Sequence, residues 1–268
     1  MTFKLAPITW CPGCSNFGIL TAVQKAVNEL GIAKQTAIAT GIGCHGKIFD
    51  YLPYSGIYCL HGRTIPTALG IKFGNPNLKV LAFAGDGDTY AEGMGHFIHA
   101  CRYNMDITLI VHNNQTFSLT TGQPTPTSES SYKDKTMKTG SFGQTINPIK
   151  LALISGATFV ARTYALDIEN TTKIIKEAIN HKGFSFVEIL QPCIIFHDTR
   201  NIISKNIYKI NSSKKIEEAI KKADEYKYDL KGKIPVGIFW QDTQKPTLEN
   251  QWPQLKNLQD KKINWRDL

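Results

Sequence analysis

The sequence lacks any hydrophobic run long enough to cross a membrane, and residues 1–4 lead into Pro7 rather than into an apolar leader segment. We therefore expect a cytoplasmic protein that does not enter the membrane. The chain also lacks an internal repeat, which excludes solenoid and propeller architectures. Its 268 residues, 42% of them hydrophobic, can build a substantial core, and we expect one large α/β domain with an appendage.

Acidic residues are scarce relative to basic ones, because 22 Asp and Glu oppose 31 Lys and Arg, for a formal net charge of +9. No aromatic stacking motif and no recognition-helix pattern accompanies this positive charge, so we expect no nucleic-acid partner. An acidic protein partner explains the charge at least as well.

Two short apolar runs, residues 80–84 and 107–111, each end abruptly in polar residues. The first is followed by Gly-Asp-Gly-Asp at residues 85–88 and the second by Asn-Asn at residues 113–114. Residues 90–103 carry apolar side chains at helical spacing, so strand, helix and strand form one crossover unit with parallel strands. Both polar clusters then lie at the carboxyl ends of neighbouring strands, where open α/β sheets bind ligands.

The polar residues at this edge are suited to an oxygen-liganded metal ion. Asp86 offers a carboxylate, Asn114 a side-chain carbonyl and Thr116 a backbone carbonyl, and a diphosphate and water would complete the octahedral shell of Mg²⁺. Gly85 and Gly87 allow close backbone approach, and the N-terminus of the following helix presents free N–H groups to phosphate oxygens. The alternative is that Gly-Asp-Gly is only a turn and Asn-Asn only a strand end.

Six cysteines in a chain expected to be cytosolic indicate metal binding or catalysis before disulfides. Cys11 and Cys14 form a Cys-x-x-Cys pair ahead of Ser15, which we expect to cap a helix over residues 16–30. Three interpretations compete: a redox-active dithiol, a structural zinc site and an iron–sulfur cluster. The first requires a preceding strand, which the sequence does not predict, and the other two require two further ligands.

The further ligands must come from the other four cysteines. Cys44 lies on a glycine-rich loop after a predicted strand, and Cys193 lies on a loop after another. Cys59 and Cys101 fall within apolar segments and are better explained as buried structural cysteines. Four loop cysteines remain, which is the number that a closed site needs.

Five segments of the chain carry a characteristic set of motifs. They are residues 10–14 (WCPGC), 41–47 (GIGCHGK), 60–66 with 70–72 (LHGRTIP and GIK), 85–88 (GDGD) and 121–127 (TGQPTPT). Gly-Asp-Gly followed by Asn-Asn resembles the thiamine diphosphate motif. In their order and approximate spacing, the five segments resemble the beta subunit of 2-oxoacid:ferredoxin oxidoreductases. The resemblance covers roughly residues 7–200.

The resemblance implies ligands for three groups. It matches a [4Fe-4S] cluster, Mg²⁺ and thiamine diphosphate to side chains of this sequence. These are Cys11, Cys14, Cys44 and Cys193 for the cluster; Asp86, Asn114 and the carbonyl of Thr116 for Mg²⁺; and Cys44, His61, Gly62, Gly85, Asp86, Gly87, Asp88 and Asn114 for thiamine diphosphate.

Lys47 matches a basic residue near the substrate, and we expect Lys47 and His61 to take part in the chemistry. The alternatives are a solvated surface lysine and a histidine that caps or packs against a helix. The sequence departs from the family pattern in two places. His45 stands where a small serine is more usual, and residues 116–121 differ from the commoner aromatic-glycine-leucine pattern. Both departures concern the choice of substrate more than the choice of cofactor.

The resemblance implies an α/β fold with a doubly wound, mostly parallel sheet and an enzyme that acts with an alpha subunit, most simply as α₂β₂. The implied reaction is oxidative decarboxylation of a 2-oxoacid to acyl-CoA and CO₂, using coenzyme A and passing electrons through [4Fe-4S] to ferredoxin. We expect 2-oxoglutarate or a broad range of 2-oxoacids ahead of strict pyruvate specificity. The alternatives are a non-redox thiamine-dependent decarboxylase or synthase subunit, and a basic zinc-stabilised interaction protein.

The chain divides, by this interpretation, into a domain that binds thiamine diphosphate, Mg²⁺ and the cluster at residues 1–200, and an irregular C-terminal extension at residues 201–268. Residues 128–145 have no periodicity and predict a long loop that covers the cofactor. The extension combines helical patterning near residues 214–226 with prolines and isolated aromatic anchors. We expect it to contact another subunit or to wrap the domain.

Overall fold

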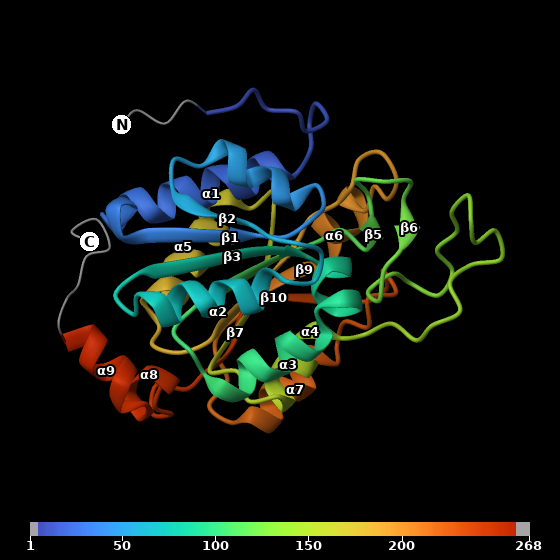
Figure 1. Ribbon diagram of the computed structural model, residues 1–268. Coiled ribbons are helices and arrows are strands. Elements are labelled where there is room, and N and C mark those ends of the chain that lie inside the picture. The colour runs from blue at the N-terminus through green and yellow to red at the C-terminus, as the bar shows by residue number, and fades with distance from the viewer. Residues whose placement is uncertain (1–4, 261–268) are drawn as a thin grey trace.

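A computed structural model describes residues 5–260 and has a single eight-stranded sheet at its centre (Figure 1). The strand order is β2-β1-β3-β4-β8-β7-β10-β9. Every neighbouring pair is parallel except β7 and β10, which are antiparallel. The strands are β1 (Thr36–Thr40), β2 (Ser55–Tyr58), β3 (Lys79–Gly85), β4 (Thr108–Asn113), β7 (Phe159–Tyr164), β8 (Ser185–Leu190), β9 (Ile207–Ile210) and β10 (Ile234–Gln241).

Helices cover both faces of this sheet, which makes it doubly wound (Figure 1). One face carries α1 (Asn16–Glu29) and α5 (Ile168–Asn180). The other carries α2 (Thr64–Gly74), α3 (Met94–Tyr103), α4 (Pro148–Ile154) and α7 (Ile216–Ala223). The predicted fold class and the predicted crossover unit are confirmed. The shorter elements are α6 (Arg200–Asn206), α8 (Leu248–Gln251), α9 (Pro253–Asp260), β5 (Thr116–Phe117), β6 (Gln123–Pro124), the 3₁₀ turns η1 (Ala33–Gln35) and η2 (His45–Tyr51), and the π-helical turn η3 (Asp88–Glu92).

The core lies in two layers, because successive residues of a strand point to opposite faces. In β3, Leu81 and Phe83 pack into the layer under α1 and α5, while Ala82 and Ala84 pack into the layer under α2, α3 and α4. All four side chains are buried. The two central strands are therefore apolar on both faces, which explains their unbroken hydrophobic runs. No helix within residues 5–260 is both long and apolar enough to span a membrane.

The C-terminal region differs from the irregular extension expected from the sequence. Residues 207–241 contribute β9 and β10 to the main sheet, and β10 pairs with β7. Phe239 and Ala219 belong to the buried core. These residues are therefore part of the α/β domain, and the remaining expectation, that the C-terminal region contacts another subunit, stays a prediction. Trp265, one of the expected anchors, lies outside the described residues.

Two local expectations also need correction. Ser15 does not cap α1, because its hydroxyl donates to the carbonyl of Pro192 at 2.8 Å instead. The helix predicted over residues 90–103 begins at Met94, and a π-helical turn, η3, precedes it. Residues 128–145 have no helix or strand, as predicted, and project beside the β5–β6 hairpin (Figure 1).

Candidate active site

A cavity of about 80 Å³ lies at the carboxyl ends of the central strands. Five chain segments enter it, one after each of β1, β2, β3, β4 and β8. The predicted site residues Cys44, Gly85, Asp86, Gly87, Asp88, His61, Asn114 and Thr116 all line this cavity. The sheet topology thus brings together Cys44, His61 and residues 85–88, which belong to three of the five motifs. It adds Asn114 and Thr116, which follow β4.

Asp86 is fully buried rather than being on a surface loop, with 2% of its surface exposed. Its Oδ2 accepts hydrogen bonds from the hydroxyls of Thr125 (2.6 Å) and Thr127 (2.7 Å). Burial raises the pKa of this carboxyl, and the two hydroxyls oppose that shift only in part. A divalent cation in the cavity would lower the pKa of Asp86 instead, since it stabilises the ionised carboxylate.

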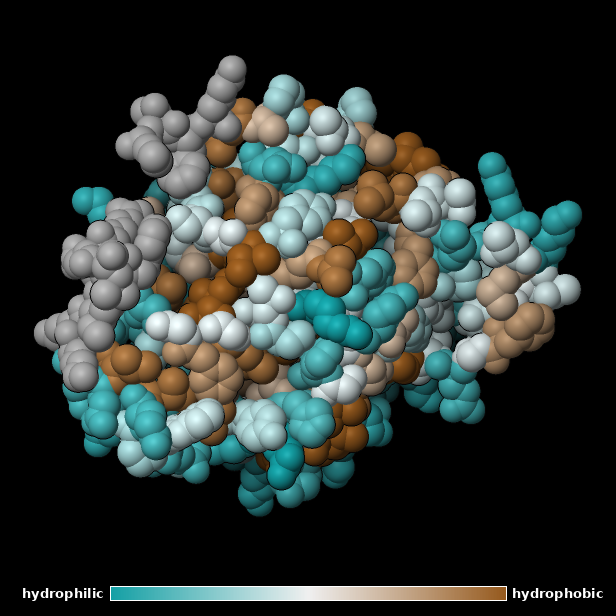
Figure 2. Space-filling model, in the orientation of Figure 1, coloured by the Kyte–Doolittle hydropathy of each residue, from teal (hydrophilic) through white to brown (hydrophobic). Residues whose placement is uncertain are grey.

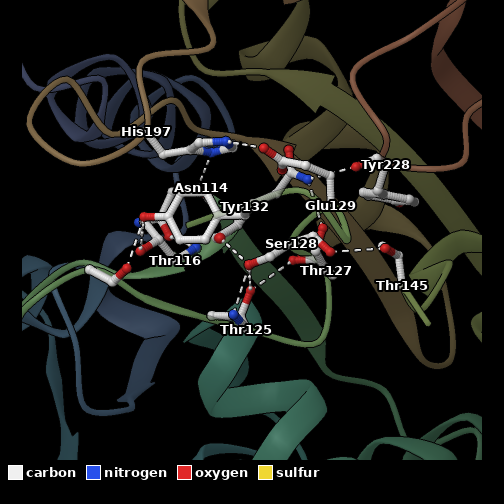
Figure 3. Close-up of polar contacts among 12 residues, drawn as sticks. Asn114, Thr116, Thr125, Thr127, Ser128, Glu129, Tyr132, Thr145, His197 and Tyr228 are labelled. Atoms are coloured by element: carbon white, nitrogen blue, oxygen red, sulfur yellow. Dashed lines mark hydrogen bonds and ion pairs between the residues drawn. The ribbon is translucent and has the colours of Figure 1, made fainter. Parts of the chain in front are cut away.

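Asn113 and Asn114 point in different directions, although the sequence presents them as one motif. Asn114 lines the cavity, and its Oδ1 accepts from the backbone N–H of Thr116 at 3.1 Å (Figure 3). Its Nδ2 donates to Ser118 and Gln191. Asn113 instead donates to the buried carboxylate of Glu188 at 2.7 Å. Only the second asparagine is therefore a candidate ligand of the cavity.

Asp88 is the most heavily bonded carboxylate of the site. Oδ1 accepts from the backbone N–H of Gly62 (2.6 Å) and lies 3.2 Å from Nδ1 of His61, while Oδ2 accepts from Thr64 (3.0 Å) and lies 3.6 Å from Nε2 of His45. Burial raises the pKa of Asp88, but the bonds from the two histidines and Gly62 outweigh it and hold the pKa below its usual range. The bond to Asp88 in turn raises the pKa of His61.

Gly62 is not among the residues that line the cavity, and its expected contact with the cofactor stays a prediction. Its backbone has φ +71°, a conformation that glycine adopts without strain, and its N–H is committed to Asp88. Its place in the site is therefore to fix the Asp88 carboxylate. Gly85 and Gly43 have a related role, since a Cβ on either would approach the His45 ring to 2.7 Å.

A second cavity of about 210 Å³ adjoins the first and contains the four loop cysteines. Cys11, Cys14, Cys44 and Cys193 all line it, although they come from distant parts of the sequence. Cys44, Ser118, Leu119 and Gln191 line both cavities. The hydroxyl of Ser118 lies 3.5 Å from the sulfur of Cys44 and 3.0 Å from Nδ2 of Asn114, so a short polar path joins the two cavities.

Two hydrogen bonds hold the cysteine segments together. Ser15 donates to the carbonyl of Pro192, which ties the first segment to the loop of Cys193. The indole N–H of Trp10 donates to the carbonyl of Cys44 at 2.7 Å. Burial raises the pKa of Cys14 to about 11 and also raises the pKa of Cys44, so these thiols are protonated unless a metal stabilises the thiolates.

Cys59 and Cys101 are buried away from both cavities, as predicted. Within residues 5–260, no three His, Cys, Asp or Glu side chains converge as ligands of one metal ion would. A single zinc ion needs four ligands at about 2.0–2.3 Å. A [4Fe-4S] cluster instead places each cysteine on a different iron, so its four sulfurs stand farther apart.

Lys47 lies in the cysteine cavity, not in the cavity of Asp86, and its Nζ donates to the carbonyl of Thr9 at 3.2 Å. His61 and Lys47 therefore belong to different cavities. Thr125 and Thr127 lie in the TGQPTPT motif, where the sequence assigns them no role, and no sequence motif includes His112 or Gln191. His112 is buried and donates from Nδ1 to Oδ1 of Asn16 at 2.8 Å, and burial holds its pKa well below the usual range.

The fold and site define a thiamine diphosphate-binding subunit, and comparison with known proteins agrees. A family model described as the C-terminal TPP-binding domain of thiamine pyrophosphate enzymes matches residues 41–189. A second, described as the C-terminal part of the pyruvate ferredoxin oxidoreductase beta subunit, matches residues 193–257.

Similar proteins indicate which kind of thiamine diphosphate-binding subunit this chain resembles. The 2-oxoacid:ferredoxin oxidoreductase subunit beta of Saccharolobus solfataricus is 44% identical over 255 residues, covering 90% of this chain and 84% of its own length. The 2-oxoglutarate synthase subunit KorB of Methanocaldococcus jannaschii is 38% identical over 242 residues, covering 90% and 89%. A solved 2-oxoglutarate:ferredoxin oxidoreductase from Magnetococcus marinus, with 2-oxoglutarate, coenzyme A and succinyl-CoA bound, superposes with a TM-score of 0.89 at 32% identity, covering 95% of this chain and 88% of that chain.

The chain belongs to the beta subunits of the 2-oxoacid:ferredoxin oxidoreductases.

Proposed function

We propose that this subunit holds thiamine diphosphate with Mg²⁺ in the Asp86 cavity and a [4Fe-4S] cluster in the adjoining cysteine cavity, and that with an alpha subunit it oxidises a 2-oxoacid to acyl-CoA and CO₂. The contact between the two cavities carries this proposal. Oxygen donors line one cavity and thiols line the other, and Cys44 and Ser118 belong to both. Hard oxygen ligands suit Mg²⁺, whereas soft thiolates suit iron–sulfur clusters.

The residues of the Asp86 cavity fit a diphosphate and its metal ion. Asp86 supplies the anionic ligand, and Asn114 and the carbonyl of Thr116 supply neutral oxygens. Gly87 packs against the ring of Phe117, and a Cβ at this position would come within 2.2 Å of that ring. Only glycine therefore fits at this turn. Thiamine diphosphate would supply the nucleophilic carbon and the electron sink that decarboxylation of a 2-oxoacid requires.

The side chains around the cofactor have distinct tasks. Asp88 holds His61 in place and favours its protonated form, which suits a position beside an anionic group. Lys47 is the cation of the cysteine cavity and is a candidate to bind a substrate carboxylate. Cys11, Cys14, Cys44 and Cys193 would hold the cluster, and its position beside the Asp86 cavity suits transfer of electrons toward ferredoxin.

An alpha subunit is needed to complete the site. Leu60, next to His61, is 77% exposed, and Ile195, close to Cys193, is 61% exposed. Large exposed apolar side chains, one next to a residue that lines the Asp86 cavity and one lining the cysteine cavity, are suited to contact with another protein. We expect that contact to close the site, in an α₂β₂ assembly, because catalysis needs the reacting carbon shielded from water. The net charge of +9 suits an acidic electron carrier such as ferredoxin.

The proposed substrate is 2-oxoglutarate or a broad range of 2-oxoacids. Two relatives named above, from Methanocaldococcus and Magnetococcus, are described by 2-oxoglutarate, and the Saccharolobus relative by 2-oxoacids in general. His45, which differs from the small serine usual in this family, lies against Asp88 and lines the Asp86 cavity. Its bulk is a feature of this chain that shapes the substrate end of the site.

The test is viologen reduction by the anaerobically purified complex of this chain with its alpha subunit. Pyruvate, 2-oxoglutarate and a branched 2-oxoacid are compared, each with and without coenzyme A. We expect reduction that depends on the acid and on coenzyme A, at a rate with 2-oxoglutarate equal to or above that with pyruvate. Release of CO₂ without viologen reduction would instead indicate the non-redox alternative.

A further inference from the structure

The TGQPTPT segment, residues 121–127, has no assigned role in the site, yet two of its hydroxyls contact the proposed metal ligand. Thr125 and Thr127 donate to Oδ2 of Asp86 at 2.6 Å and 2.7 Å. All three residues are buried. Within residues 5–260, Oδ1 of Asp86 has no side-chain hydrogen-bond partner. Both hydroxyls therefore donate to the same carboxylate oxygen, Oδ2, and the other hydrogen bonds to this carboxylate come from the backbone of Asp86 and Gly87.

The hydroxyl of Thr125 is held in its direction by its neighbours. The backbone N–H of Thr125 donates to Oγ of Ser128 at 2.8 Å (Figure 3). The Ser128 hydroxyl donates in turn to the carbonyl of Gln115. The Thr125 proton is directed to Asp86, because the carboxylate oxygen at 2.6 Å is a closer and stronger acceptor than the Ser128 hydroxyl at 3.3 Å. The turn at residues 125–128 thus presents its first hydroxyl to the carboxylate.

The hydroxyl of Thr127 connects Asp86 to a buried charge network. The single O–H of Thr127 is shared between Oδ2 of Asp86 at 2.7 Å and Oδ1 of Asn113 at 2.9 Å, and Asn113 donates to Glu188 at 2.7 Å. Glu188 also accepts from Arg162 at 2.8 Å, and both side chains of this pair are fully buried. A buried, fully bonded pair of this kind cannot move without a large loss of free energy. Thr127 is therefore anchored to a rigid part of the sheet.

We infer that Thr125 and Thr127 are positioning residues that fix the rotation of the Asp86 carboxylate so that Oδ1 is presented to Mg²⁺ of bound thiamine diphosphate. This inference rests on the proposed function. A metal ligand that is already oriented loses little freedom when the ion binds, so the two hydroxyls increase affinity for the metal and its diphosphate. A purely structural role would stabilise the loop and leave affinity unchanged.

The test compares Thr125→Val, Thr127→Val, Thr125→Ser and Thr127→Ser in the complex with the alpha subunit. Valine keeps the shape and removes the hydroxyl, whereas serine keeps the hydroxyl. Thr145→Val is the matched control, since its hydroxyl donates to the carbonyl of Ser128 in the same loop and does not touch Asp86 (Figure 3). Calorimetry measures thiamine diphosphate affinity over a range of Mg²⁺ concentrations, and thermal unfolding of the cofactor-free protein is followed alongside.

Each valine variant should weaken Mg²⁺-dependent affinity about tenfold, the effect of one hydrogen bond to a charged acceptor. The serine variants and Thr145→Val should stay within about twofold of the unmodified protein. If Thr127 acts through Asp86, adding Thr127→Val to Asp86→Asn should cause no further loss. Unchanged affinity in both valine variants would overturn the inference, as would equal loss in the Ser and Val variants or in Thr145→Val. If the unmodified complex binds no thiamine diphosphate, the proposed function fails instead.

Discussion

Asp86 is the only anionic oxygen donor among the proposed Mg²⁺ ligands, and its burial changes what its removal should do. On a surface loop its loss would spare the fold, but here Asp86→Ala removes the closest acceptor of the buried Thr125 hydroxyl and leaves the Thr127 hydroxyl with Asn113 as its acceptor. Stranded buried donors cost roughly 1–3 kcal/mol. A substitution that keeps an oxygen acceptor is therefore the cleaner probe of metal binding.

We predict that Asp86→Asn weakens Mg²⁺-dependent thiamine diphosphate binding by about 100-fold or more, because a charged ligand becomes neutral. The unfolding temperature should fall by only a few degrees, since the amide oxygen still accepts from the two threonines. Calorimetric titration measures the first and differential scanning calorimetry the second. Asp229→Asn, at an exposed carboxylate, is the control. Unchanged affinity would remove Asp86 from the site.

The six cysteines should divide into two groups. We predict that replacing Cys11, Cys14, Cys44 or Cys193 by Ala lowers iron content from about four per chain, whereas Cys59→Ala and Cys101→Ala retain it. The reason is position, since the first four line one cavity and the last two are packed in apolar core. Iron and acid-labile sulfide assays on anaerobic protein decide the matter. Loss of iron in the Cys59 variant with retention in the Cys193 variant would reverse the assignment.

At the residue scale, the sequence identified the donors but not their orientation. Asn113 and Asn114 are identical side chains in one motif, and only their partners distinguish them: Glu188 lies 75 positions from Asn113, and Gln191 lies 77 positions from Asn114. The hydroxyls on Asp86 come from residues 39 and 41 positions away. Contacts over such distances depend on how the sheet brings loops together, and a local pattern does not contain that information.

Among the elements, α1 packs closely against the chain segment after β7 at Gly18. A Cβ at Gly18 would approach the carbonyl oxygen of Ala165 to 2.1 Å, and that atom belongs to backbone that cannot easily move. Gly70 in α2 is the opposite case, since it is exposed and a Cβ there would meet nothing within 4 Å. The two glycines therefore offer a matched test of element packing.

We predict that Gly18→Ala destabilises the chain by about 2 kcal/mol or more, whereas Gly70→Ala stabilises it by roughly 0.5–1 kcal/mol. The first change forces α1 away from the loop after β7, and the second only reduces the freedom of the unfolded chain. Urea unfolding followed by circular dichroism measures both. Two changes of the same sign would contradict the packing of α1 described here.

The central strands were predictable and β10 was not. The runs at residues 80–84 and 107–111 are continuous and apolar, so they match buried parallel strands. Strand β10 contains Pro235 and Gly237, which ordinarily argue against an internal strand. Pairing with β7 begins only at Gly237, opposite Arg162, so the missing N–H of Pro235 is not needed on that side. Tertiary pairing thus overrides the local signal.

At the scale of the whole molecule, the surface of the single chain carries exposed hydrophobic side chains. Figure 2 shows hydrophobic patches between hydrophilic side chains on the face that carries α2. Residues 207–241 are part of the sheet, so removal of the chain after Asn201 would take away core strands and is no test of subunit contact. Variants of exposed apolar residues are better suited to that purpose.

We predict that the isolated chain, even with cluster and cofactor bound, shows no 2-oxoacid-dependent viologen reduction, because the wall that shields the reacting carbon is missing. Leu60→Ser and Ile195→Ser should weaken co-purification with the alpha subunit, because both side chains are exposed and apolar. Neither change should lower iron content, since neither residue is a proposed ligand of the cluster. Mass spectrometry verifies that the single chain is free of partner. Turnover by that chain at a rate comparable to the complex would refute the need for a second subunit.

The central claim is that one subunit carries the thiamine site and the cluster in adjoining cavities. The most direct measurement is the visible absorbance of the anaerobic complex after 2-oxoacid is added, in the presence and absence of thiamine diphosphate. The account predicts a brown protein whose absorbance near the blue edge of the spectrum bleaches on addition of the acid, and only when thiamine diphosphate is bound. A correctly folded complex that is colourless, or whose colour is unaffected by the acid, would contradict it.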